Sequence, residues 1–237
     1  MARARRKSGS FLPWLLRVAG IVVLTGIGFA MWLWWDMREW RPDPALYPQQ
    51  GAVIASGAGR TRFETLAATG AAFVYLELAP ASDRPDPGFA SRLESAMASE
   101  LKVGVVAPFD PCLSADVQSA RYTRMVPREA SLLPPAIALG DTGAGCLPAV
   151  SQAAVESELM TLVNQIEMHA GKPVILKLER GFAERHETAR TTARDLWLMR
   201  DRARPDYAGR PWLLWSANSQ RVSEATRGPI EWVVVQR

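Results

Sequence analysis

An acid directly after a buried-looking strand is the first residue in this sequence that could do chemistry. The run SLLPPAIALGDTGAGC, residues 131–146, is apolar up to Leu139 and then turns polar and glycine-rich at Asp141. Barrel enzymes keep catalytic carboxylates at such strand ends, where they serve as general acids or bases. Asp141 is therefore a candidate catalytic acid if a one-residue bulge turns it inward. Otherwise it points away from the face of Ala138 and Gly140 and caps its own loop.

Three glutamates lie in or beside other apolar runs. Glu77 sits inside VYLELA, where burial of an unpaired acid is costly, so we expect a partner such as Lys177 of ILKLE. The alternative for Glu77 is a ligand-binding acid. Glu179 and Arg180 end their strand on the rim where a functional site is expected. The alternative for both is that they are solvated loop residues. With Glu231, the candidate catalytic acids are Asp141, Glu77, Glu179 and Glu231.

Tryptophans near the last two apolar runs are candidates for ligand binding. Trp212, Trp215 and Trp232 have large apolar ring faces that could stack on a sugar ring. Packing in the core is the alternative for all three. Trp212, which follows GRP, is the best of the three candidates for stacking on a sugar.

Metal and nucleotide chemistry find no support in the sequence. His169 and His186 have no cysteine or carboxylate at ligand spacing, so we expect both on helix surfaces and no metal site. No glycine-rich phosphate-binding signature follows a strand, so we expect no cofactor. Cys112 and Cys146 are expected to form a disulfide in an oxidising compartment, with two free buried thiols as the alternative.

The charge of the chain is unevenly distributed. The 237 residues carry a formal net charge of +4, and 48% of them are hydrophobic, which argues against disorder. Five basic residues and no acid lie in the first 35 positions. The other 23 basic residues and all 24 acidic residues lie in 36–237, a net charge of −1. The main domain therefore lacks the positive charge that nucleic-acid binding requires.

The N-terminal region predicts a membrane anchor. Residues 18–35 are uncharged and long enough to cross most of a hydrocarbon core. The basic segment 1–17 is expected in the cytoplasm, and tryptophans mark the far interface. A cleaved signal peptide and a buried core helix are the alternatives, but no small-residue cleavage site follows the run. We expect a single-pass bacterial inner-membrane protein with a linker at 36–46 and a periplasmic domain at 47–237.

Eight short apolar runs predict the strands of that domain, at 51, 72, 102, 136, 173, 195, 212 and 232. Several are apolar at consecutive positions, as in parallel strands that are covered on both faces. Helical patterns separate the earlier strands, with the longest over 151–171. Full helices only in the first part favour a flattened, incomplete β/α barrel over an open doubly wound sheet.

The order of several strings resembles the glycoside hydrolase family 25 lysozymes, which cut peptidoglycan. GAAFVYLELA is similar to the second strand of the family, DPGF to the start of its next helix, and ELKVGVV to its third strand. VPREASLLPPAIAL is similar to the approach to the fourth strand, and GRPWLLWSAN to a closing strand. The resemblance covers residues 47–236 and implies a flattened eight-strand barrel. Paired cysteines also resemble those of one bacterial subgroup.

The resemblance fails at the catalytic positions. The fourth strand of the family ends in a D-x-E pair on one strand face, which falls here on Ala138 and Gly140. The aspartate of its first strand falls on Val53. Other polar positions of the family's motifs fall near Pro80 and on Val106 and Ala107. A late D-x-N motif of the family falls on the segment Glu231–Val233, where one acid remains.

These losses predict a divergent, catalytically inactive member that binds peptidoglycan or another glycan, or acts as an envelope scaffold. Two alternatives remain open. One is an active glycan hydrolase with relocated acids, and the other is a protein-interaction module of an envelope complex.

Overall fold

The computed structural model describes residues 11–82, 84–187 and 192–236, and it divides the chain into two compact units, 1–39 and 40–237. The described part of the first unit is helix α1 (Phe11–Glu39). Within it, Trp14–Asp36 is long and apolar enough to cross a membrane, and none of this segment is buried. The expected span 18–35 lies inside this segment.

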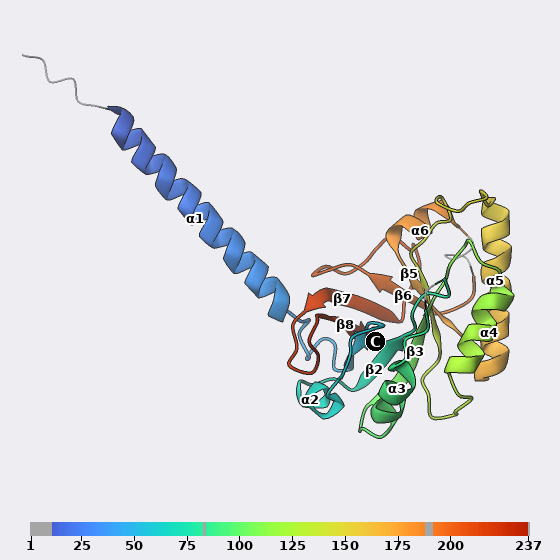
Figure 1. The fold of residues 1–237 in the computed structure, drawn as a ribbon. Helices are drawn as coiled ribbons and strands as arrows, with labels where there is room; N and C mark the ends of the chain where they lie inside the picture. Colours follow the sequence, from blue (N-terminus) through green and yellow to red (C-terminus); the bar gives the residue numbers. More distant parts are fainter. Residues whose placement is uncertain (1–10, 83, 188–191, 237) are drawn as a thin grey trace, which may run out of the picture. The chain divides into compact units, whose positions relative to one another are not determined.

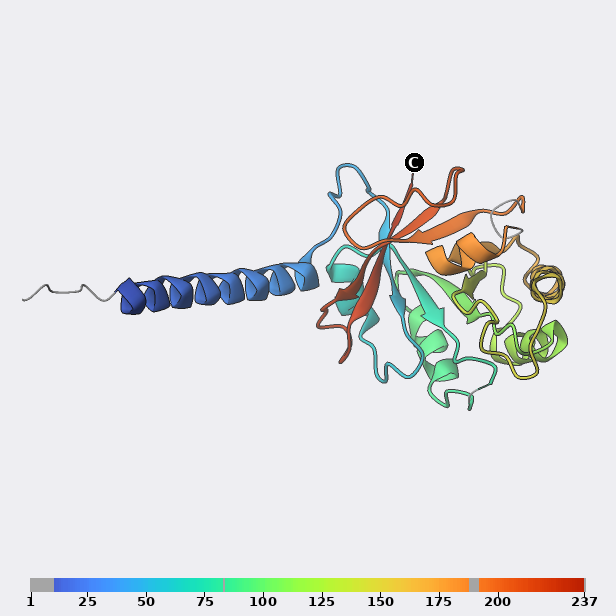
Figure 2. The same ribbon diagram turned by 90° about the horizontal axis from the view of Figure 1, so that it is seen from above.

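The second unit is a closed barrel of eight strands in sequence order (Figures 1 and 2). Neighbours from β1 to β7 are parallel, whereas β8 is antiparallel to both β7 and β1. All eight predicted strands are therefore confirmed. They are β1 (Gln50–Ile54), β2 (Phe73–Glu77), β3 (Lys102–Pro108), β4 (Ala136–Leu139), β5 (Ile175–Leu178), β6 (Leu196–Met199), β7 (Leu214–Arg221) and β8 (Ile230–Val235).

Helices cover the barrel unevenly. Each of the first five strands is followed by a helix, and α4 and α5 lie side by side (Figures 1 and 2). In the part that the structure describes, no helix joins β6 to β7 or β7 to β8. The helices are α2 (Phe63–Ala68), α3 (Phe89–Met97), α4 (Ala115–Met125), α5 (Gln152–Ala170) and α6 (Arg180–Arg185). The sequence did not predict α6, because six residues are too few to show a helical period.

Side chains of alternate strand residues build two cores. One set fills the barrel interior, and the other lies between the strands and the surrounding elements. In β2, for example, Phe73 and Tyr75 point inward, whereas Val74 and Leu76 point outward. We call the end of the barrel at the carboxyl ends of the parallel strands its mouth. The alternation assigns to it the last inward residue of each parallel strand and the first inward residue of antiparallel β8. The inward set is Val53, Phe73, Tyr75, Val106, Ala136, Ile175, Trp197, Leu214 and Val233.

The segment before β1 is part of the barrel unit. The Arg41 guanidinium donates to the Thr69 carbonyl at 2.8 Å, and the Asn218 amide donates to the Trp40 carbonyl at 2.9 Å. Gln50 donates to the Pro42 carbonyl at 3.1 Å. The linker expected at 36–46 is therefore divided between the end of α1, which continues to Glu39, and a segment that contacts the barrel from Trp40 onward.

Asp86 fixes the loop that follows β1 to the start of α3. Its carboxylate accepts hydrogen bonds from the Gly57 N–H at 3.0 Å and the Gly88 N–H at 2.8 Å, and it forms an ion pair with Arg92. The hydrogen bond from Arg92 is the main cause that lowers the pKa of Asp86 to about 2, and burial opposes it. The DPGF string thus has a structural role at a helix start.

Replacing Asp86 with asparagine should destabilise the barrel by about 1–2 kcal/mol at pH 7. The folded-state pKa lies below the ordinary value, so this stability is present above about pH 4 and is lost as the pH falls towards 2. Urea unfolding of wild type and Asp86→Asn at pH 7 and pH 2.5 measures the difference. A gap of equal size at both pH values would contradict the assignment.

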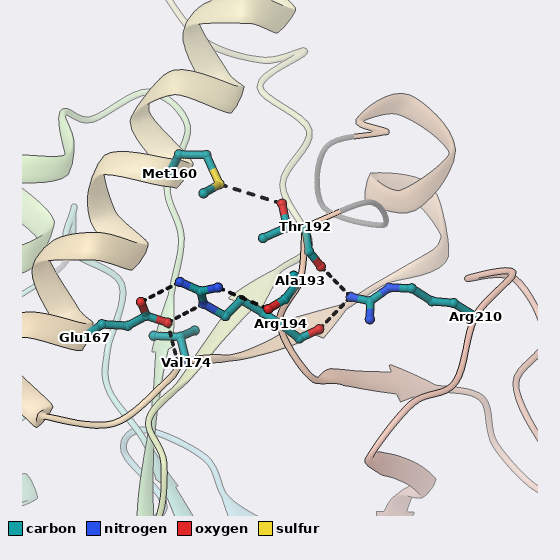
Figure 3. Close-up of polar contacts among 7 residues, drawn as sticks. All are labelled: Met160, Glu167, Val174, Thr192, Ala193, Arg194 and Arg210. Carbon is teal, nitrogen blue, oxygen red and sulfur yellow. Dashed lines mark hydrogen bonds and ion pairs between the residues drawn. The ribbon is translucent and has the colours of Figure 1, made fainter.

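A second charged cluster joins α5 to the starts of β5 and β6 (Figure 3). Glu167 binds Arg194 through both oxygens, with Nε–Oε1 at 2.5 Å and Nη2–Oε2 at 2.8 Å. The same carboxylate accepts the Val174 N–H at 2.9 Å. Arg210 adds contacts to the carbonyls of Thr192 and Arg194. Burial alone would raise the pKa of Glu167, but the bonds from Arg194 and Val174 hold it below its usual range.

Replacing Glu167 with glutamine should cost about 1.5–3 kcal/mol, because the amide loses charge-assisted bonds and leaves Arg194 unpaired. Thermal unfolding of Glu167→Gln measures the loss. Glu94→Gln, on the exposed face of α3, is the matched control and should change stability by less than about 0.5 kcal/mol. Equal melting temperatures for the two variants would refute the prediction.

Candidate functional site

Polar side chains meet inside the barrel at the carboxyl ends of the parallel strands. Glu77 of β2, Lys177 of β5 and Ser216 of β7 each follow an inward apolar residue by two positions. Glu231 precedes inward Val233 by two, and because β8 is antiparallel its first residues lie at this same end. We call Glu77, Lys177, Ser216 and Glu231 the mouth cluster.

Glu231 is held by two partners. Lys177 Nζ lies 2.7 Å from Glu231 Oε2, and the Ser216 hydroxyl donates to Glu231 Oε1. The Trp197 indole donates to Ser216 Oγ at 2.7 Å from below, and the Lys177 ammonium lies 5.1 Å from the centre of that ring. Both carboxylate oxygens are thus engaged, and Lys177 is only 4% exposed. The arrangement orients Glu231 and balances its charge.

Glu77 has a different environment. Its pKa is raised chiefly by burial, with Lys177 and a hydrogen bond from the Ser56 backbone opposing the shift and Glu231 and Glu179 adding to it. The expected partner of Glu77 was Lys177, but the Lys177 ion pair that the structure describes is with Glu231. The reason is that β8 closes the barrel and brings Glu231 onto the lysine. Glu77 therefore keeps its proton to a higher pH than an exposed glutamate does.

Strand β4 contributes no carboxylate to the mouth. Ala138 packs against the inner core, and Gly140 follows on the same strand face. A Cβ at Gly140 would lie 2.7 Å from Oε1 of Glu179. Glu179 thus occupies the space beside Gly140, because Leu139 and Leu178 are paired in register and place the next residues side by side. The exposed carboxylate of Glu179, the residue after β5, therefore lies where a side chain at position 140, the residue after β4, would point.

Asp141 turns back onto its own loop. Its Oδ1 accepts the Gly143 N–H at 2.8 Å, the capping arrangement expected without a bulge. The Cys112–Cys146 disulfide is present and joins the loop after β3 to the loop after β4. The rim next to Gly140 is therefore covalently braced.

The tryptophans lie away from the mouth. Trp212 and Trp215 are at the amino end of β7, and Trp215 is buried against Trp40 and Tyr47, with its indole donating to the Arg200 carbonyl at 2.8 Å. Trp212 is half-buried beside it. Trp232 is fully buried and donates to Gln50 at 2.6 Å. In the structure, these rings pack the outside of the uncovered strands.

Neither histidine belongs to a metal site in the described residues, which contain no metal-ligating group of three or more side chains. His169 is half-buried on α5 and contacts the Val126 carbonyl at 2.9 Å. The expectation of a surface position is wrong for His186, which is fully buried beyond the end of α6. Its ring packs 4.5 Å from that of Phe182, so the last turn of α6 covers it.

Other rim residues were partly recognisable from sequence. Arg180 lies at the rim as expected, with its guanidinium 3.5 Å from Asp206 and 5.0 Å from the Tyr207 ring centre. Ser216 and Trp197 were missed. A tryptophan and a serine in apolar runs look like ordinary strand residues, and only the barrel register brings them beneath Glu231.

Comparison with known proteins identifies the fold. No protein-family model and no curated protein matches the chain. Among solved structures, a family 25 glycosyl hydrolase from Bacillus anthracis superposes with a TM-score of 0.73 at 20% identity, covering 84% of this chain and 92% of that one. A bacterial lysozyme from Streptomyces coelicolor gives 0.70 at 14% identity, covering 80% and 92%. The modular autolysin LytC from Streptococcus pneumoniae, solved in complex with a synthetic peptidoglycan ligand, gives 0.63 at 10% identity, covering 79% and 46%.

Proposed function

Because the barrel has the fold of the family 25 lysozymes, we propose that it binds peptidoglycan at its mouth without hydrolysing it through the fourth strand. Helix α1 would anchor the domain in the bacterial inner membrane with the N-terminus in the cytoplasm. The barrel would then lie in the periplasm, where a disulfide is stable and the glycan is within reach. The protein would act as a wall-binding or scaffolding module.

The observation that carries this proposal is the state of the acids around the mouth. Strand β4 presents Ala138 and Gly140, and Glu231 has both oxygens engaged by Lys177 and Ser216. A glycosidase needs one carboxyl group to protonate the leaving oxygen and a second on the opposite side of the reacting sugar carbon. Neither Ala138 nor Gly140 can supply such a group, whereas Glu77 and Glu231 of the mouth cluster are partly exposed and could accept hydrogen bonds from sugar hydroxyls.

Full-length protein in detergent micelles tests this function by co-sedimentation with insoluble peptidoglycan and by release of reducing ends. We expect sedimentation without release. Glu179→Gln should weaken binding severalfold, because this exposed carboxylate lies at the rim beside Gly140. Glu100→Gln, at an exposed position just before β3 and so at the opposite end of the barrel from the mouth, should bind as wild type. Failure of the wild-type protein to sediment would refute the proposal.

A relocated-acid hydrolase is the second candidate, and Glu179 is the observation that favours it. Its carboxylate fills the space beside Gly140, and the neighbouring Glu77 has a raised pKa, as a general acid requires. In this reading Glu77 protonates the leaving oxygen and Glu179 acts from the other side. Asp141 and Glu231 are the remaining acids, but Asp141 Oδ1 accepts the Gly143 N–H and both oxygens of Glu231 are engaged.

The same assay separates the two candidates. A hydrolase would release reducing ends, and Glu77→Gln and Glu179→Gln would each abolish the release while leaving the fold intact. Release that survives both substitutions would exclude this acid pair. If wild type releases no reducing ends at every pH tested from 4 to 8, the hydrolase is excluded.

The protein-interaction module has no specific observation in its favour. The exposed large apolar side chains described in the barrel unit lie on separate elements, as single residues do on ordinary surfaces. They are Leu46, Met97, Val117, Leu147, Met168 and Val222.

A further inference from the structure

A groove with three exposed arginines lies at the same end of the barrel as the mouth cluster. It consists of two hollows of about 630 and 560 Å³ that share Arg60 and Arg62. The loop after β1 forms the shared wall. Helix α3 and the residues just before it form one outer wall, and the turn between β7 and β8, with Arg227, forms the other. We call Arg60, Arg62 and Arg227 the arginine groove.

The arginines differ in their contacts. The Arg62 N–H donates to the Ala225 carbonyl at 2.9 Å, and its guanidinium donates to the Glu224 carbonyl, so Arg62 ties the two loops together. Arg60 and Arg227 are exposed, and neither makes an ion pair with another described residue. The guanidinium groups of Arg60 and Arg227 can therefore bind a ligand, while Arg62 holds together the two loops that carry them.

The acids of the groove do not cancel this charge. Asp86 lines it, but its carboxylate is occupied by Arg92 and by two backbone N–H groups. Glu64 and Glu224 are exposed at its edges and leave the lining with an excess of positive charge. Thr61 also lines the groove, and its hydroxyl oxygen is buried without a partner among the described residues.

We propose that the arginine groove binds the carboxylates of peptide stems on peptidoglycan, while the mouth holds the sugar chain. This inference rests on the proposed function and names the part of the polymer that the second site takes. Guanidinium groups bind carboxylates through two parallel hydrogen bonds, which gives both geometry and strength. The mouth cluster has its lysine neutralised by Glu231, so it offers little attraction to an anion. In this proposal the neutral sugar chain lies at the mouth cluster, and the anionic stem peptides lie in the arginine groove.

The test compares full-length wild type with the double variant Arg60→Gln/Arg227→Gln in detergent micelles. Both bind soluble peptidoglycan fragments whose stem carboxylates are free or have been amidated. We expect the double variant to bind free-acid fragments about tenfold more weakly, which corresponds to about 1.4 kcal/mol. Amidation should weaken wild type by a similar factor and leave the double variant unchanged. Arg124→Gln/Arg128→Gln removes the same charge from α4 and the segment that follows it, and should bind as wild type.

Three results would overturn the inference. Equal affinities of the two double variants would show that charge at the groove is irrelevant. Insensitivity of wild type to amidation would exclude the stem carboxylates. Arginine-dependent binding to phosphatidylglycerol vesicles but not to fragments would assign the groove to lipid phosphates instead. If wild type binds neither the free-acid nor the amidated fragment, the proposed peptidoglycan binding fails as well. If it binds both equally, only the inference about the arginine groove fails.

Discussion

Lys177→Met is expected to lower the melting temperature of the barrel by about 10 °C, from a loss of about 3–5 kcal/mol. The substitution preserves most of the side-chain volume but leaves the Glu231 carboxylate in the barrel without its cation. A carboxylate left without its cation is the main cost, because the Glu231 side chain is only 14% exposed and little water can replace the lysine. Glu231 would hold only the Ser216 hydroxyl.

A second substitution separates this cause from lost packing. Lys177→Met/Glu231→Gln removes both charges and keeps an acceptor for Ser216, so most of the lost stability should return. Lys102→Met, at an exposed position on β3, is the matched control and should change stability by less than about 0.5 kcal/mol. Thermal unfolding by circular dichroism at pH 7 measures all three. A double variant as unstable as Lys177→Met would rule out the unpaired charge as the cause.

Loss of the Cys112–Cys146 disulfide is expected to destabilise the barrel by about 3–4 kcal/mol, from the entropy of the unfolded chain that the bridge restricts. The bridge spans 34 positions and joins two loops of the rim. Cys112 is exposed, so a reductant can reach the bond without unfolding the domain. The loops after β3 and β4 should then open locally before the rest of the barrel.

Thermal unfolding with and without dithiothreitol measures the effect, and a decrease of about 10 °C is expected. Cys112→Ala and Cys146→Ala should each match the reduced protein, since either change breaks the same bridge. Dithiothreitol should have no effect on the variants, which controls for general effects of the reductant. A wild-type melting temperature unchanged on complete reduction would contradict the prediction.

The candidate site was only partly predictable from sequence. That Ala138 and Gly140 share one strand face and bring no carboxylate to it could be read from a single strand, because strand alternation is local. The position of Glu179 could not, because it depends on the register between β4 and β5. The Lys177 partner was assigned to Glu77 for the same reason. From sequence alone, Glu77 and Glu231 are equally plausible partners of Lys177. Only the closure of the barrel by β8 brings Glu231 within ion-pair distance of the lysine.

The sequence by itself determined the eight strands, the membrane-length helix and the long helix α5. Ser151 accepts the Ala154 N–H at 3.1 Å, and Gly171 ends the helix with a φ of 66°. These features follow from periodicity and from backbone preferences that act within a few residues. Tertiary structure alone decided which charges meet, which rim position Glu179 fills, and that His186 is buried. Those outcomes depend on contacts between residues far apart in the chain, and barrel closure sets their geometry.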